Sequence, residues 1–193
     1  MKPMNTEKRS SGEDQPADAT TRAKADYEAM LASFRTVELA TVSPEGIPEA
    51  SYAPALFAGE RCFYVYVSEL SGHTRNLLET GKASVLVIED ESECANLFAR
   101  KRATFDCTAS EIERDTDPWH ALMDRFGEKF GNTMNALRKM ADFHLIRLRP
   151  HEGRLVLGFG QAYDIVGDRV DELTHVRGIN GGGHRKESKK GAS

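Results

Sequence analysis

The chain has 193 residues, of which 39% are hydrophobic and 29% charged, and its formal net charge is −4 at pH 7. This length fits one domain with a sizeable core, and the acidic balance gives no global reason to expect binding to nucleic acid or to an anionic membrane surface. No apolar run approaches the roughly 18 residues of a transmembrane helix, so no membrane insertion is expected.

Residues 1–21 contain no apolar core and do not read as a secretory signal. The three cysteines, Cys62, Cys94 and Cys107, form an odd set without CxxC spacing. This pattern argues against a disulfide scaffold and against a structural zinc site. We therefore expect a reducing compartment, the cytoplasm.

The N-terminal part of the chain is expected to contain a disordered leader and one helix. Residues 1–20 are rich in charged and hydroxyl side chains, which bury too little surface to offset their ordering entropy. Over residues 21–35, apolar side chains recur at helical spacing and predict an amphipathic helix.

The rest of the chain alternates between short strands and turns. Apolar alternation or continuous apolar runs predict strands over residues 37–41, 49–57, 62–67, 83–88, 102–113, 143–148 and 154–166. Helices are expected over residues 73–80, from Asp117 to about residue 130, and over residues 133–140. Strands joined by short turns, with few helices inserted, predict an antiparallel β-barrel flanked by helices over residues 21–167, followed by a tail of residues 168–193.

Several segments point to a known fold. These are Glu38-Leu39-Ala40-Thr41-Val42, followed by Gly46 and Ser51-Tyr52-Ala53-Pro54, and then Ser71-Gly72-His73-Thr74-Arg75-Asn76-Leu77. The first group resembles the opening hairpin of pyridoxamine-phosphate-oxidase-like split barrels. The second resembles the phosphate-binding strand-to-helix element of that superfamily.

Further blocks are more specific. They lie at residues 88–91, 97–105, 113–115, 126–128, 142–143, 158–163 and 183–186. In this order they are similar to the haem-utilisation proteins of the HugZ and HutZ family. The resemblance covers about residues 22–188, although the spacer before His184 is some residues longer than is usual in that family.

The resemblance implies a split barrel of six to eight strands that dimerises across a broad sheet surface. In flavin-using relatives FMN lies in the cleft between subunits, and in the haem branch a similar cleft holds haem. The implied activity is a haem-binding, haem-degrading oxygenase that uses O₂ or peroxide. It would need an external electron donor, since this length leaves no room for a reductase domain. A haem-delivery protein is a further candidate partner.

His184 is the main candidate for an iron ligand, because neutral imidazole is a common axial ligand of haem. The glycines of residues 181–183 would let the backbone approach a flat macrocycle closely, and Arg185 and Lys186 could pair with haem propionates. From the residues alone, a flexible basic tail is the favoured interpretation of this segment; the resemblance to the family's Gly-His-Arg-Lys favours the iron ligand instead.

The resemblance implies that Asp142 accepts a hydrogen bond from the second ring nitrogen of the axial histidine. This Asp142 could belong to the other subunit of the dimer. Such an acceptor fixes the tautomer of a ligating histidine and strengthens it as a donor. The alternative for Asp142 is a cap or turn residue between a helix and a strand.

Three other basic residues are candidate anion contacts. His73 and Arg75 lie near a helix start, where free N–H groups favour phosphate, so they could serve FMN phosphate or a haem carboxylate. Arg102 begins a strand, one face of which would look into the cleft. The alternatives are solvated helix residues and a solvated strand edge. The remaining histidines, His120, His144, His151 and His175, are interpreted as structural.

Two rival functions remain open at this point. One is an FMN-dependent oxidoreductase on the same barrel, which would not need a terminal Gly-His-Arg-Lys. The other is a haem store or carrier with the same ligands and no turnover. No G-x-S-x-G, Walker A or Rossmann motif is found in a suitable context, so hydrolase, NTPase and dinucleotide-binding functions lack support.

Overall fold

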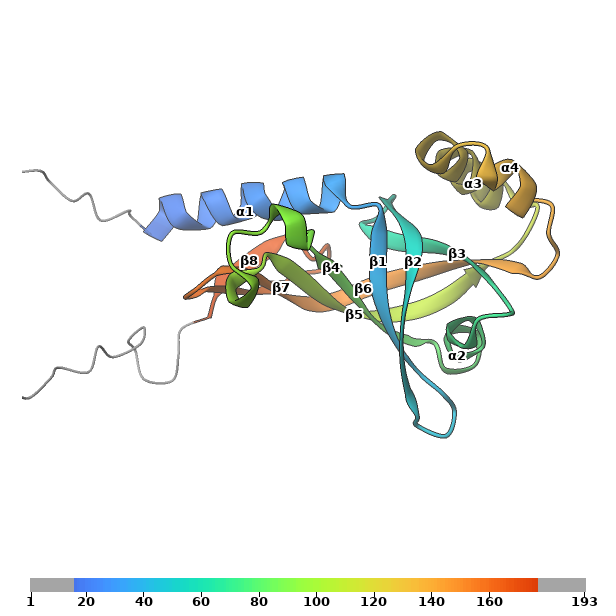
Figure 1. The fold of residues 1–193 in the computed structure, drawn as a ribbon, viewed down its shortest axis with the longest axis horizontal. Coiled ribbons are helices and arrows are strands. Elements are labelled where there is room, and N and C mark those ends of the chain that lie inside the picture. Colours follow the sequence, from blue (N-terminus) through green and yellow to red (C-terminus); the bar gives the residue numbers. More distant parts are fainter. Residues whose placement is uncertain (1–15, 177–193) are drawn as a thin grey trace, which may run out of the picture.

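The computed structural model describes residues 16–176, with side chains from residue 19 onward (Figure 1). Its elements are α1 (Pro16–Ser33), β1 (Thr36–Val42), β2 (Pro48–Ala58), β3 (Cys62–Ser68), α2 (Gly72–Thr80), β4 (Lys82–Ile88), the 3₁₀ turns η1 (Glu91–Glu93) and η2 (Leu97–Ala99), β5 (Arg102–Ile112), α3 (Asp117–Phe130), α4 (Thr133–Leu137), β6 (Phe143–Gly158), β7 (Gln161–Val166) and β8 (Glu172–His175).

The strands form one antiparallel sheet in the order β3-β2-β1-β4-β5-β6-β7-β8. Because β3 also pairs with β6, the first six strands of that order close into a barrel, and β7 and β8 extend the sheet beyond it. Helices α1 and α2 pack close to the barrel, while α3 and α4 lie together at one end of the molecule (Figure 1). The predicted antiparallel barrel flanked by helices is confirmed.

The core has two parts. The barrel interior is filled by inward-facing strand residues such as Leu39, Phe63 and Phe105, and α1 adds Tyr27 and Leu31. A second cluster lies between the outer face of β3 and helices α3 and α4; it contains Tyr64, Tyr66, Trp119, Met123 and Phe126. Strand β3 is therefore buried on both faces, which explains why its sequence is a continuous apolar run.

Helix α1 begins at Pro16, five residues before the predicted start, so the expected leader of residues 1–20 is wrong for residues 16–20. Proline is favoured at the first helical position because its fixed φ suits the helix and its missing N–H has no partner there anyway. The Tyr27 hydroxyl donates to the Val170 carbonyl at 2.7 Å and ties the helix to the segment before β8.

Strand β6 runs unbroken from Phe143 to Gly158, where two separate strands were expected. Pro150 lies at an irregularity in the pairing with β5, where Cys107 pairs with Pro150 and Asp106 with Glu152. Proline is tolerated at such a bulge because no ladder hydrogen bond is required of it. The expected strand over residues 154–166 is broken by a turn at Phe159 and Gly160, and the short strand β8 was not predicted.

None of the helices in the described part of the chain has the length and apolar character that crossing a bilayer requires.

Candidate functional site

Asp142 lies in the turn before β6 and is tied to the end of β3. The Ser68 hydroxyl donates to Asp142 Oδ2 at 2.7 Å, and the backbone N–H of Glu69 donates to the Asp142 carbonyl at 2.9 Å. Within residues 16–176, Asp142 Oδ1 accepts no hydrogen bond. The carboxylate is thus oriented through one oxygen and offers the other as an acceptor.

Two exposed apolar residues lie near the segments that hold this carboxylate, one after β3 and one before β6. Leu70, whose N–H donates to Ser68 Oγ at 3.1 Å, is 93% exposed, and Met140, two residues before Asp142, is 45% exposed. Large apolar side chains with so little cover next to an unused acceptor are typical of a binding surface rather than of packing.

Ser68 also connects Asp142 to helix α2. The Thr74 hydroxyl donates to the Ser68 carbonyl at 2.6 Å, which fixes the start of α2 against the end of β3. The structure therefore brings together Asp142 and the first turn of α2, where His73 and Arg75 lie.

The side chains of His73 and Arg75 point to different surroundings. His73 is buried, and its Nδ1 lies 2.9 Å from Ser51 Oγ. Burial lowers the pKa of His73 from 6.5, and the Glu49 carboxylate offsets this only in part, so the ring is neutral at physiological pH. Arg75 is exposed and forms no hydrogen bond or ion pair with any other residue of the described region.

A carboxylate already lies at the start of α2. A Cβ atom built on Gly72 would be 2.5 Å from Glu49 Oε2, so this oxygen lies directly against the first helical residue. Asn76 Nδ2 donates to the same oxygen and to Thr41 Oγ1, both at 3.1 Å. A phosphate at this helix N-terminus would lie close to the Glu49 carboxylate, with no charged imidazole to offset the repulsion, so the segment fits FMN phosphate poorly.

Stability should fall as pH drops below the ordinary histidine pKa, because of His73. Its folded-state pKa lies below 6.5, so the unfolded chain binds the proton first, and the free energy of unfolding decreases as pH falls through this window. Urea titrations between pH 5 and pH 8 should show a smaller pH dependence for His73→Asn, which retains a polar group near Nδ1. An unchanged slope in the variant would contradict the buried neutral imidazole.

The pKa of His144 shifts in the opposite direction from that of His73. Its Nδ1 lies 2.6 Å from Glu111 Oε1 and its Nε2 lies 2.8 Å from Glu69 Oε1, so both ring nitrogens donate to carboxylates. Burial opposes the charge, but these two hydrogen bonds outweigh it and raise the pKa of His144 above 6.5. The stabilisation is present below pH 6.5 and is lost as pH rises through the raised pKa. His144→Asn therefore serves as the contrasting variant in the same titrations.

Arg102 lies at the other end of the barrel. It begins β5, whereas Ile112 at the far end of β5 pairs with Leu145, near Asp142. Ten residues separate the two ends of β5, roughly 33 Å along a strand. Arg102 Nη1 donates to the Arg100 carbonyl at 2.9 Å. Exposed apolar side chains are found at this end as well, namely those of Leu97, Phe98 and Phe159.

Val176, the last described residue before the C-terminal tail, lies in the same row of neighbouring strand residues as Arg102. Arg102 pairs with Val156, Val156 pairs with Ala162, and the Val176 N–H donates to the Ala162 carbonyl at 2.8 Å. His184, Arg185 and Lys186 lie outside the described residues. Within one chain, Arg102 and the start of the tail thus share one end of the sheet, and Asp142 lies at the other.

Comparison with known proteins identifies the family. A model of the pyridoxamine 5'-phosphate oxidase family matches residues 23–157. The chain is 42% identical, over 154 residues, to a protein named heme oxygenase HutZ from Vibrio cholerae; the match covers 80% of this chain and 85% of that protein. The chain belongs to the HutZ branch of the pyridoxamine 5'-phosphate oxidase family.

Solved structures agree with membership of the HutZ branch. A crystal structure of Vibrio cholerae HutZ, described there as a heme storage protein, matches with a TM-score of 0.66 and 38% identity, covering 70% of this chain and 94% of that one. Campylobacter jejuni ChuZ matches with a TM-score of 0.75 and 34% identity, covering 86% of this chain and 66% of that one. The resemblance to the split-barrel superfamily and to its HugZ and HutZ members is confirmed.

Some residues around Asp142 and α2 were not found from the sequence. Ser68 at the end of β3, Glu69 after it and Glu111 in β5 contact Asp142 or His144, and Glu49 reaches α2 from β2. One signal was available for Glu49: a glycine at the first position of a helix indicates a close approach by another group.

Proposed function

We propose that this chain binds haem and degrades it oxidatively, with O₂ or peroxide and electrons from an external reductant. The observation that carries the proposal is the 42% identity to heme oxygenase HutZ over 85% of that protein's length. Haem would be the substrate, so the protein would mainly supply an axial ligand, orientation and access.

The surroundings of Asp142 support the first half of the proposed haem site, which consists of the acceptor for the axial histidine and an apolar contact surface. Its free Oδ1 could accept the N–H of an imidazole whose other nitrogen binds iron, which would fix the tautomer and strengthen the ligand. The exposed side chains of Leu70 and Met140 offer apolar contact to the edge of a flat macrocycle.

The Arg102 end of the sheet supports the second half of the proposed haem site, which consists of the axial ligand and the cations for the propionates. The tail that carries His184 leaves the sheet beside Arg102, and His184 is the proposed axial ligand. Phe98, which is 87% exposed, offers an apolar surface there. Arg102 with Arg185 and Lys186 would supply cations for the propionates.

Chain geometry supports a site shared between two subunits. His184 follows Val176 by eight residues, which span at most roughly 29 Å when fully extended. Arg102 and the Asp142 end of the sheet are separated by roughly 33 Å along β5. The backbone of the tail is therefore shorter than the distance between the two ends, and a homodimer with antiparallel packing would bring the two halves together.

Two alternatives remain to be tested against this proposal. Haem storage without turnover is favoured by the description of the HutZ structure as a heme storage protein. An FMN-dependent oxidase is favoured by the family fold. Glu49 at the start of α2 argues against the FMN alternative, because its carboxylate would repel a phosphate bound there.

The proposal predicts a Soret band that saturates at about one haemin per subunit and then decays when ascorbate is added with O₂. Absorbance spectra of the purified protein check both steps, and catalase added to a parallel sample separates degradation by O₂ from degradation by released peroxide. A stable Soret band under ascorbate would favour storage. Retained yellow FMN without a Soret shift on adding haemin would favour the flavin enzyme.

A further inference from the structure

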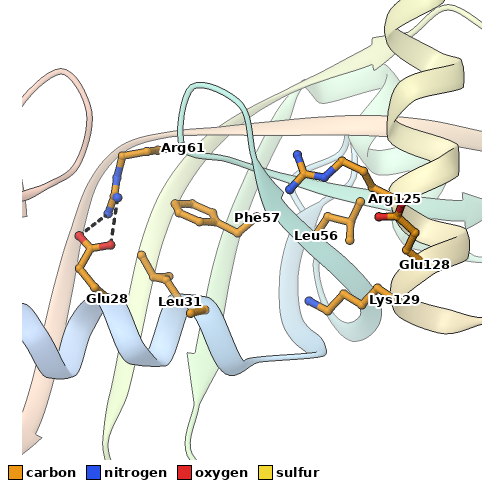
Figure 2. Close-up of a pocket in the computed structure, with 9 residues that line it drawn as sticks. Glu28, Leu31, Leu56, Phe57, Arg61, Arg125, Glu128 and Lys129 are labelled. Atoms are coloured by element: carbon orange, nitrogen blue, oxygen red, sulfur yellow. Dashed lines mark hydrogen bonds and ion pairs between the residues drawn. The ribbon is translucent and has the colours of Figure 1, made fainter.

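A separate pocket of about 610 Å³ lies between α1, the β2–β3 hairpin and α3 (Figure 2). Its volume is within the range of small-molecule sites. None of its lining residues belongs to either half of the proposed haem site. They are Glu28, Leu31, Ala32, Leu56, Phe57, Arg61, Arg125, Glu128 and Lys129.

One end of the pocket holds an ammonium group that has no carboxylate partner among the described residues. Lys129 Nζ donates to the carbonyls of Phe34 at 2.7 Å and Ala55 at 3.0 Å and lies 4.6 Å from the centroid of the Phe34 ring, so its third N–H has no oxygen acceptor in the described part of the chain. Burial lowers the pKa of Lys129, and the nearby cations Arg35 and Arg125 lower it further. An anion beside Lys129 would relieve this repulsion and accept its remaining N–H.

Arg125 adds a second cation to the same end. Its guanidinium forms no hydrogen bond or ion pair with the other residues that the structure describes. Figure 2 shows Arg125 and Lys129 on the same helix, with Leu56 between them and Glu128 beside them. Glu128, three residues after Arg125 on α3, is the carboxylate with which a bound anion would have to compete.

The opposite end is closed by an ion pair. Arg61 donates to both carboxylate oxygens of Glu28, at 3.0 and 3.1 Å, and its side chain is only 15% exposed (Figure 2). Arg61 Nε is buried and has no acceptor, the one such side-chain atom in the described part of the chain. A buried donor of this kind marks a place where an acceptor is missing.

Between the two ends the pocket floor is apolar. Leu31 from α1 and Leu56 and Phe57 from β2 line it, and Figure 2 shows the Phe57 ring between the Arg61 and Arg125 ends. A cationic end next to an apolar floor matches a ligand that carries a carboxylate on a hydrocarbon body.

We propose that this pocket binds a small amphipathic carboxylate, with its carboxylate at Lys129 and Arg125 and its hydrocarbon part along Leu31 and Phe57. This binding does not depend on haem and would occur in the haem-free protein.

The test is isothermal titration calorimetry of the full-length, haem-free protein with sodium decanoate, and with 1-decanol as the neutral counterpart. Decanoate is expected to bind at one molecule per chain, and decanol at least about 10-fold more weakly, because it lacks the charge-assisted hydrogen bonds. Absence of decanoate binding, or equal binding of decanol, would overturn the proposal.

Variants locate the site without disturbing the core. Arg125→Gln should weaken decanoate binding about 10-fold, and Glu128→Gln should strengthen it by removing the competing carboxylate. Ala32→Phe, at an exposed position on α1, should weaken binding by filling the pocket. Arg169→Gln, at an exposed arginine in the turn before β8, is the matched control and should bind as the wild type does. If all four variants bind equally, decanoate binds elsewhere and the proposal fails.

Discussion

Replacing His184 with alanine is expected to abolish tight haem binding and, with it, ascorbate-driven degradation. The change would remove the iron–nitrogen bond that the proposal assigns to the tail and would leave only propionate and apolar contacts. Loss of an outer-shell partner at a metal site typically costs about 10- to 100-fold, so loss of the ligand itself should exceed about 100-fold in affinity. Haemin titration followed at the Soret band measures this directly.

His175→Ala is the control for this experiment. His175 is the other histidine of the C-terminal region, but its Nε2 lies 3.0 Å from the Gly160 carbonyl and its ring packs edge-on against Tyr163 at a centroid distance of 5.1 Å. Its loss should therefore leave haemin affinity near that of the wild type. Tight haemin binding in His184→Ala, together with loss of haemin binding in His175→Ala, would identify His175 of β8 as the iron ligand and refute the assignment of His184.

Local patterning explains why most of the barrel could be predicted. In β1 the inward residues Val37, Leu39 and Thr41 are buried, and Thr36, Glu38 and Ala40 between them are exposed, as the period of a half-buried strand requires. Pro150 misled the prediction because proline usually ends a strand, and the bulge that accommodates it depends on β5, more than 40 residues away. The polar strand β8 carries no apolar signal of its own and exists because β7 pairs with it.

The candidate site was harder to predict, because its organisation depends on sheet register. The sequence indicated Asp142, Arg102 and His184 only through the family resemblance, without their relative positions. Register puts Arg102 and Val176 in one row of the sheet, and Asp142 beyond the opposite end of β5. The contact between Glu49 and Gly72 links residues 23 positions apart, and no local pattern reports it.

Asp142→Asn is expected to keep haem bound but to slow its degradation by about 10- to 100-fold, because the amide nitrogen would take the place of Oδ1 and cannot accept the ligand's ring N–H. The Ser68 hydrogen bond can be retained by the amide oxygen, so the turn before β6 should stay in place. Single-turnover absorbance with ascorbate measures the rate, and haemin titration is the control for binding. Wild-type turnover in this variant would return Asp142 to the role of a turn residue.

Combining the two changes tests whether each site draws on two subunits. His184→Ala and Asp142→Asn chains with different tags are co-expressed, and the mixed dimer is purified through both tags; light scattering should give twice the chain mass of 21.4 kDa. If His184 and Asp142 of one site come from different subunits, the mixed dimer has one intact site and one doubly altered site, so its rate should be about half that of the wild-type dimer. If both residues come from the same chain, the mixed dimer has no intact site, and its rate should stay near the slow rate of Asp142→Asn. A chain that remains monomeric would rule out the shared site, because such a site needs residues from two subunits.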